Sequence, residues 1–271
     1  MLRTGPVVTS LACMIALAGC IDRSKIVPGP ETARRELALK GIPYNENAFV
    51  ERAGGGDTVT VKLFLAAGMS PNAKNESGET ALLAAAGKGR SVIVKTLVAA
   101  GADVNAKDKN GLTALMRSAR DGAAEMTRTL LEHHPDVNAR ADSGATALMY
   151  AAWKESPSIV KALLEAGADV NARDNDVGTA LAWAAFFNRI EMTRALLARG
   201  ADPNIKNNQG GTALMIAAAK GNQEIIRELL DKGADINAKD EEGLTAQMWA
   251  ARGEHDETAR LLKQEAEGKK R

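Results

Sequence analysis

Two adjacent histidines beside an aspartate are the residues whose types come closest to a metal-binding set. They are His133 and His134, with Asp136 two residues further on. Neighbouring side chains rarely chelate one ion together, and the spacing matches no known zinc site. The two cysteines, Cys13 and Cys20, both precede Ile21, so the rest of the chain can form neither a thiolate site nor a disulfide framework. We therefore expect no metal and no cofactor.

Carboxylates recur along the chain once every 33 residues, each with an asparagine two positions later. Paired carboxylates could perform acid–base catalysis. Aspartate and asparagine are also turn formers that bond neighbouring backbone, and this explains the whole set. No phosphate-binding loop and no Ser-His-Asp or Cys-His set can be assembled, so we expect no enzyme. The pairs are Asp103 and Asn105, Asp136 and Asn138, Asp169 and Asn171, Asp202 and Asn204, and Asp235 and Asn237.

A basic residue also recurs once per period, which could make an anion-binding stripe. The row is interrupted by Asp108, Asp174 and Asp240, and 35 Lys and Arg residues almost balance 34 Asp and Glu residues. A solvated row is therefore the preferred interpretation. A nucleic-acid partner would need a basic domain or stripe, and none is expected here. The row comprises Lys74, Lys107, Arg140, Arg173, Lys206 and Lys239.

The elements that carry these residues are set by a Thr-Ala pair that recurs six times with a spacing of 33 residues. A strict period of this length indicates a solenoid of stacked units, which offers a long concave surface. In the fullest copy, Thr80 is expected to cap a first helix and Gly101 to end a second helix over residues 92–99. The pairs begin at Thr80, Thr113, Thr146, Thr179, Thr212 and Thr245.

The repeated Gly-x-Thr-Ala-Leu followed by Ala-Ala resembles the ankyrin repeat, with Ala in place of the family's Pro. Met116, Met149, Met215 and Met248 stand where the family has His. The resemblance covers about residues 45–271. It implies an all-α ankyrin-repeat solenoid of about seven helix-turn-helix units, with protruding turn fingers and a concave face built from the first helices. The units begin near Asn45, Gly78, Gly111, Gly144, Val177, Gly210 and Gly243.

The first and last units are expected to be caps. A leading helix and an N-terminal capping repeat are assigned to residues 32–77, five full repeats to 78–242 and a C-terminal capping repeat to 243–271. In the last unit, Gln247 and Lys263 replace apolar residues of the full repeats. Polar residues at these positions suit an end face with no further neighbour.

The N-terminus has the pattern of a bacterial lipoprotein signal. Arg3 precedes an apolar stretch over residues 7–18, too short to span a bilayer. Leu17-Ala18-Gly19-Cys20 resembles the lipobox. This predicts a signal peptide at 1–19 and a lipidated Cys20 with a flexible tether at 20–31. Ordinary cleavage, leaving a soluble periplasmic protein, is the alternative. Ile21 in place of Asp favours the outer membrane by resemblance to enterobacterial sorting.

Aromatic residues break the symmetry of the repeats, because five of them lie in units four and five. Trp153, Phe186 and Phe187 are expected to face the concave groove and bind a partner, since aromatic side chains dominate interface energetics. For Tyr150 and Trp183, as for Trp249, space filling and binding remain open. The predicted partner-binding set is Tyr150, Trp153, Trp183, Phe186 and Phe187, with the cations Arg120, Lys154 and Lys220.

The sequence therefore predicts a lipid-anchored, monomeric binding protein of the bacterial envelope that faces the periplasm. Its partners would be another protein, through the groove, and the membrane, through the lipid on Cys20. One alternative is an immunity or inhibitor protein that neutralises a toxin or an envelope enzyme. A remote alternative is an enzyme on an ankyrin scaffold, for which the chain outside the repeats leaves no room.

Overall fold

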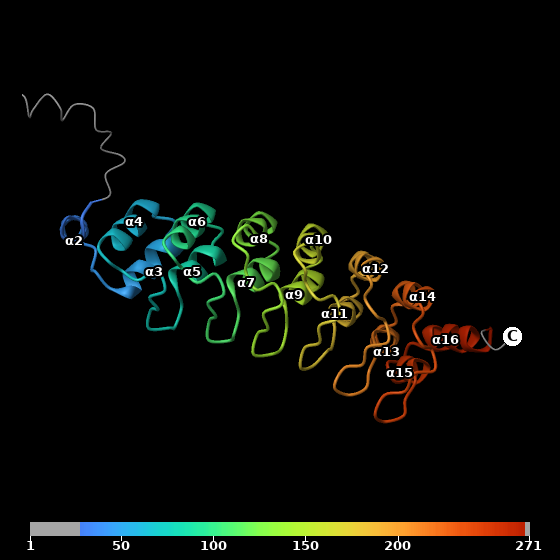
Figure 1. Cartoon of the computed structure of the whole chain (residues 1–271). Coiled ribbons are helices and arrows are strands. Elements are labelled where there is room, and N and C mark those ends of the chain that lie inside the picture. Colours follow the sequence, from blue (N-terminus) through green and yellow to red (C-terminus); the bar gives the residue numbers. More distant parts are fainter. Residues whose placement is uncertain (1–27, 269–271) are drawn as a thin grey trace, which may run out of the picture.

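The computed structural model of the protein describes residues 28–268, which form 15 helices (Figure 1). The predicted signal peptide, Cys20 and most of the predicted tether lie outside the described residues. A leading helix, α2 (Pro30–Leu39), precedes seven helix pairs. These are α3 (Glu46–Gly55) and α4 (Thr58–Ala66), α5 (Ala81–Gly87) and α6 (Ser91–Ala99), α7 (Ala114–Asp121) and α8 (Ala124–Leu131), α9 (Ala147–Lys154) and α10 (Pro157–Glu165), α11 (Ala180–Phe186) and α12 (Ile190–Ala198), α13 (Ala213–Ala219) and α14 (Gln223–Asp231), and α15 (Ala246–Arg252) and α16 (Asp256–Gly268).

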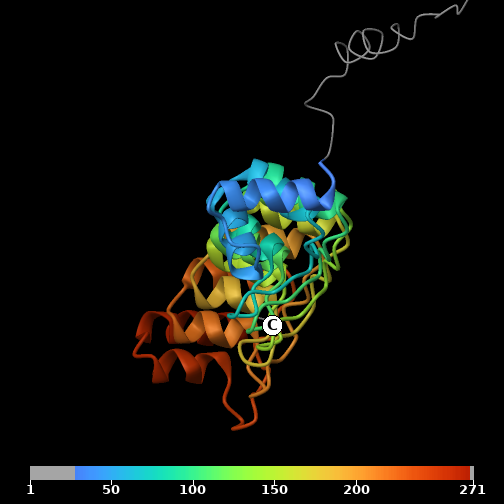
Figure 2. The same ribbon diagram turned by 90° about the vertical axis from the view of Figure 1, so that its left-hand side faces the viewer.

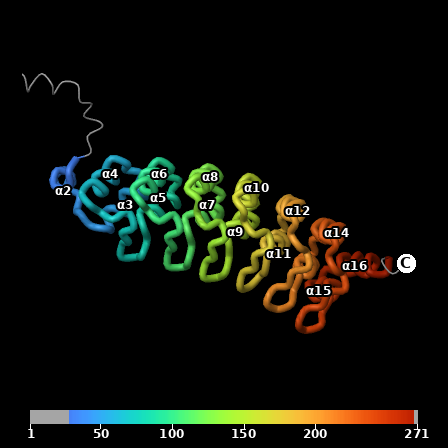
Figure 3. The backbone as a smooth tube through the Cα atoms, viewed as in Figure 1, coloured from blue at the N-terminus to red at the C-terminus, as the bar shows by residue number. Residues whose placement is uncertain are grey.

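The helix pairs stack side by side into one elongated array. The first helices, α3 to α15, form an inner row in which each helix packs against the next, and the second helices from α4 to α14 form an outer row in the same way. Loops that join one unit to the next project from the inner row as fingers (Figure 3). Successive units step progressively to one side when the array is seen from its α2 end (Figure 2). The predicted all-α solenoid of seven units is confirmed.

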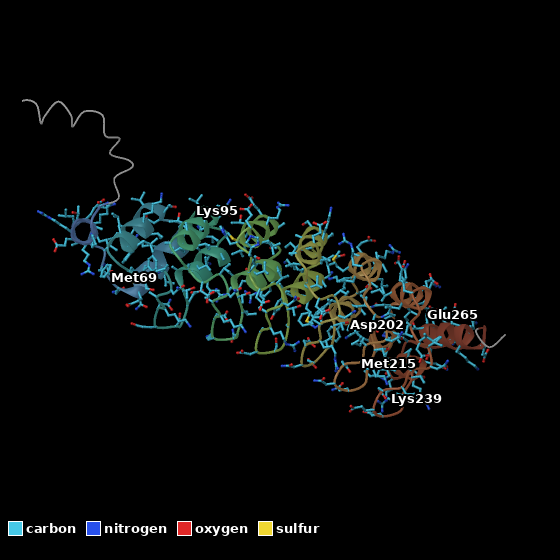
Figure 4. All side chains as sticks on the ribbon, in the orientation of Figure 1. Met69, Lys95, Asp202, Met215, Lys239 and Glu265 are labelled. Carbon is cyan, nitrogen blue, oxygen red and sulfur yellow. The ribbon has the colours of Figure 1, made fainter. Side chains whose placement is uncertain are left out.

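The outer row and the fingers lie on opposite sides of the array. Lys95, on α6, and Lys239, in the last finger, mark these two sides (Figure 4). Within residues 28–268 the single strand-like pairing is a bridge between Lys74 and Thr80, at the base of a finger. The fingers are therefore held by turns and by their neighbours rather than by a sheet.

Threonine hydroxyls cap four of the inner helices, as the sequence predicts for Thr80. The hydroxyl of Thr80 accepts a hydrogen bond from the amide of Leu83 at 3.3 Å, and Thr113, Thr179 and Thr212 make the equivalent bond. Each bond satisfies one amide that the helix start would leave without a partner. The apolar residues that follow fill the core, which includes Leu82, Ala85, Ala86, Val94 and Leu97.

The turn between the two helices of a unit requires a left-handed residue. Gly89, Gly122 and Gly221 supply it in units two, three and six, where glycine adopts a positive φ without steric cost. Glu155, with a φ of 59°, and Asn188, with a φ of 55°, take the same conformation in units four and five. The backbone of these two units is thus unchanged although the glycine is missing.

One asparagine per unit joins neighbouring fingers. Its side-chain oxygen accepts a hydrogen bond from the amide of the aspartate one unit later, and that aspartate's carboxylate accepts from the amide two residues on. The Asp and Asn pairs are therefore structural turn residues, as expected, and they also link the units. We call these contacts the asparagine ladder; they run from Asn72 to Asp103, Asn105 to Asp136, Asn138 to Asp169, Asn171 to Asp202 and Asn204 to Asp235, at 2.7–2.9 Å.

The two ends differ from the middle units. Helix α2 begins at Pro30, two residues before the predicted start at 32, so the tether assigned to 20–31 is too long at its end. Proline suits the first turn of a helix because its missing amide needs no partner there. At the other end, Gln247 and Lys263 are exposed, as expected of a capping unit, and Met248 is 49% exposed while its equivalents are buried.

Candidate partner-binding surface

The inner helices present three columns of residues to the groove between them and the fingers. Unit four contributes Tyr150, Trp153 and Lys154, and each neighbouring unit contributes residues 33 positions away. In units two and six most of these positions hold small residues or lysine. In units four and five, five of the six positions are aromatic, so the surface there has a different chemistry from the rest of the groove.

The five aromatic residues form one continuous cluster across α9 and α11. The ring centroids of Tyr150 and Trp183 are 5.9 Å apart, those of Trp153 and Phe187 6.1 Å and those of Trp183 and Phe187 6.0 Å. Phe186 and Phe187 meet edge to face at 5.0 Å. These separations are those of favourable aromatic pairs, so the rings hold each other in place. We call Tyr150, Trp153, Trp183, Phe186 and Phe187 the aromatic cluster.

The members of the cluster differ in exposure. Phe186 is 39% and Phe187 36% exposed, whereas Tyr150, Trp153 and Trp183 are half-buried. Phe187 follows the last residue of α11 and caps it, so it lies just outside the helix. Its ring nevertheless lies among the other four. An exposed pair of phenylalanines above half-buried rings is a shape typical of interaction surfaces.

Trp183 is held in place by Asp174, a residue that stands out in the sequence only because it interrupts the basic row. The indole Nε1 of Trp183 donates a 2.6 Å hydrogen bond to Oδ2 of Asp174, in the finger before α11. Asp174 is only 6% exposed, and it also accepts from the amide of Gly178. Trp183 is therefore anchored and partly a space-filling residue, and its orientation is set by the finger.

A pattern in the sequence could have identified this link. In three units the finger position is Asp and the residue nine positions later donates to it: Asp108 with Arg117, Asp174 with Trp183 and Asp240 with Trp249. It is Asn in units two and six, where the corresponding helix residues are Ala84 and Ile216. Unit four differs, since Ala141 stands nine residues before Tyr150 there, so the pattern indicates a contact only where the finger position is Asp.

The three predicted cations lie around the aromatic cluster, one in each of three units. Lys220 places its Nζ 4.3 Å from the centroid of the Phe186 ring, a cation–π contact. Arg120 pairs with Asp121 at 3.3 Å. Lys154 and Lys220 are exposed, and neither forms an ion pair within residues 28–268. Their charges are therefore available to a partner.

The N-terminal half of the groove forms a depression, and Arg117, which lines it, is paired with carboxylates of the protein. A depression of about 820 Å³ is lined by small residues such as Gly54 and Gly87 and by Arg117. The guanidinium of Arg117 donates to Glu79 at 2.6 Å and to Asp108 at 2.8 Å. Burial alone would raise the pKa of Asp108, but the bonds from Arg117 and two amides outweigh it and hold that pKa below its usual 3.8. Arg117 thus has both partners inside the protein.

The residues considered for metal binding and for anion binding have structural positions. His134 adopts a φ of 51° where other units have the glycine that ends the second helix, as the sequence suggests. No group of three or more ligands that could hold a metal is present in the described part of the chain. The basic row is exposed, and Lys107 and Lys206 donate to the backbone of the next finger.

Among the described helices, none combines the length and the apolar character that crossing a bilayer requires. The predicted membrane contact depends on Cys20, which lies outside the described residues. The described residues therefore include the groove but not the residue predicted to contact the membrane.

Comparison with known proteins identifies the repeats. The chain matches a family model described as ankyrin repeats (3 copies) over residues 93–174 and 181–271, and models described as ankyrin repeats (many copies) over 64–115 and 158–197. Among solved structures it is similar to the ankyrin repeat domain of Bcl-3, a unique member of the IkappaB protein family. That similarity has 30% identity and a TM-score of 0.69, and it covers 77% of this chain and 96% of the other. None of the curated proteins matches the chain.

Proposed function

The chain belongs to the ankyrin-repeat family, and from that we propose that it is a non-catalytic module that captures another protein in its concave groove. We further propose that a lipid on Cys20 holds it in the bacterial cell envelope, facing the periplasm. The repeats and the similarity to the Bcl-3 domain support an interaction module. The anchor and the location rest on residues 1–20 of the sequence.

The aromatic cluster is the observation that carries the binding proposal. Two phenylalanines remain more than one-third exposed although Ala or a charged residue at the same positions serves the fold in other units. Exposed aromatic side chains that are held rigid lose little conformational freedom on binding, which makes them effective contact residues. A protein partner that covers Trp153, Phe186 and Phe187 would bury this surface.

Crosslinking in intact cells followed by isolation of the full chain from membranes tests the proposal. The wild type is compared with a Trp153→Ala/Phe186→Ala/Phe187→Ala variant. A matched control replaces three exposed apolar residues outside the groove, Leu39, Val59 and Val92, with Ala. We expect one protein to be recovered with the wild type and the control but not with the groove variant. Equal recovery with the groove variant would refute the site.

The anchor is tested separately with Cys20→Ser. If Cys20 carries the lipid, the variant should no longer incorporate labelled palmitate. It should also leave the membrane fraction, because the acyl chains on Cys20 supply its affinity for the membrane. A variant that remains in the membrane fraction without palmitate would show that another segment anchors the chain. Outer-membrane location predicts that the wild type co-sediments with outer-membrane markers in a density gradient.

A further inference from the structure

A second hollow lies in the groove beyond the aromatic cluster, between units five and seven. It has a volume of about 320 Å³, and its apolar walls are Val177, Phe186, Ile216, Ala219 and Trp249. The hollow exists because the residue one unit after Phe186 is the small Ala219. The equivalent residue one unit before Phe186 is the large Trp153. Val177 reaches the hollow in the one full repeat whose finger glycine is displaced by one residue, to Gly178 with a φ of 112°.

The walls of this hollow are held in place before anything binds. The indole Nε1 of Trp249 donates to Oδ2 of Asp240 at 2.7 Å, which fixes the far wall. Phe186 is held between Phe187, 5.0 Å away, and Lys220. Ile216 is buried and forms the floor. A preformed apolar hollow favours an apolar side chain because little ordering is needed when it binds.

The two rims of the hollow carry opposite charges. Lys220 follows the last residue of α13, at the end of the helix away from the fingers, and its ammonium lies over Phe186. Asp176 lies in the finger that precedes α11, on the other side. Gln209, from the next finger, also lines the hollow and offers an amide to a peptide backbone. A bound segment would therefore be oriented by charge as well as by shape.

We propose that this hollow is a subsite for one apolar side chain of an extended protein segment, with an acidic residue of that segment paired to Lys220. On the opposite side of the apolar residue the segment carries a neutral or basic residue, which faces Asp176. The proposal rests on the groove being the binding surface and adds the chemistry of what the groove selects. The proposal predicts the order of residues in the segment: an acidic residue, then an apolar residue, then a neutral or basic residue.

A phage-displayed library of random linear peptides, selected on the full chain, tests this rule. We expect enriched peptides to carry Leu, Ile, Met or an aromatic residue with Asp or Glu on one side only. Ala219→Leu should fill the hollow and weaken the best peptide by about tenfold or more in fluorescence anisotropy. Lys220→Glu should select peptides with Lys or Arg in place of the acidic residue.

Two control variants lie in the same columns, far from the hollow. Gly87→Leu adds the same side chain as Ala219→Leu and Lys88→Glu reverses the same charge as Lys220→Glu, both in unit two. Neither should change the selected peptides. Failure to enrich any peptide, or an enrichment unaffected by Ala219→Leu and Lys220→Glu, overturns the subsite. The proposed function would survive that result if the triple aromatic variant still lost its partner in cells, and it would fail if that loss did not occur.

Discussion

Trp183 and Asp174 are joined by a 2.6 Å hydrogen bond between the indole nitrogen and a carboxylate that is almost completely buried. The bond connects the finger before α11 to the middle of the groove. Trp183 in turn contacts the rings of Tyr150 and Phe187. The shape of the aromatic cluster therefore depends on a residue in a turn, and substitutions in the finger should change the positions of the rings at the binding surface.

Asp174→Ala should destabilise the fold and loosen Trp183. The carboxylate accepts from the amides of Gly178 and Asp176 and from the indole, and a buried donor left without a partner costs about 1–3 kcal/mol. Urea unfolding should show this loss, and the Trp183 indole proton should shift in NMR spectra. Asp174→Asn should be milder in unfolding because Asn207 serves the same two amide positions in unit six.

Asp142→Ala is the control for this prediction, because Asp142 lies in the neighbouring finger and is exposed. It should leave both unfolding and the indole signal unchanged. If Asp174→Ala behaved like Asp142→Ala, the indole bond would have no measurable role in the cluster.

Leu163→Ala and Phe187→Ala should have opposite consequences. Leu163 is fully buried in α10, so its truncation should lower the free energy of unfolding by about 2–5 kcal/mol. Phe187 is partly exposed, so its truncation should change melting little and weaken partner binding by about 2 kcal/mol or more if it is a hot spot. Thermal melts and binding measurements on both variants separate the two roles. A melt of Phe187→Ala as low as that of Leu163→Ala would make the ring a core residue.

Acid should destabilise the N-terminal units through Asp57 and Asp108. The backbone amide of Thr60 and then its hydroxyl hold the pKa of Asp57 below its usual 3.8, and Arg117 with two amides does so for Asp108 against burial. A carboxyl whose pKa is lowered by folding stabilises the protein above its unfolded pKa of about 3.9, and this contribution is lost as the pH falls through the folded value. Stability should therefore fall in this window as both groups take up protons.

Urea unfolding at pH values above and below this window measures the effect. The Asp57→Asn/Asp108→Asn variant should be less stable than the wild type at neutral pH but should lose less stability on acidification, because it has two fewer linked carboxyls. Asn75 and Asn207 already occupy the position of Asp108 in other units, so the turn itself should persist. An acid-induced loss equal to that of the wild type would contradict the assignment.

Glu155→Gly should stabilise the protein. Glu155 is held at a φ of 59°, which is strained for a residue with a Cβ. The change removes its ion pair with Arg189, but that pair is exposed and contributes little. Relief of the left-handed strain, about 1–2 kcal/mol, exceeds the entropic cost of glycine, about 0.5–1 kcal/mol, so we expect a net gain of about 0.5–1 kcal/mol in the free energy of unfolding. Asn188→Gly should gain less, because asparagine tolerates this conformation better, and Gly122→Ala is the reverse control.

The sequence determines the scaffold more completely than the site, for a physical reason. Thr80 and Gly101 specify a helix start and end through their own backbone preferences, and the same residue types recur in most units. The start of α2 at Pro30 was missed because the same proline suits both a tether and a first helical turn. Local preferences thus gave the solenoid to within a few residues.

The details of the candidate site depend on contacts between units, which no local preference encodes. The cation–π contact of Lys220 with Phe186 joins two repeats, and the position of Phe187 beyond the end of α11 depends on where the helix stops. The bond of Asp174 to Trp183 was predictable only by comparing the units with each other. The assignment of the site to binding remains a prediction.

The asparagine ladder has a consequence for how such a chain can change its length. Every joint from Asn72 to Asp235 uses the same pair of atoms at nearly the same distance. Duplicating or excising one whole period would therefore recreate an identical seam, whatever residues the neighbours present to the groove. Whole repeats can therefore be added or removed, and the length of the groove offered to a partner can change independently of the residue at any single position.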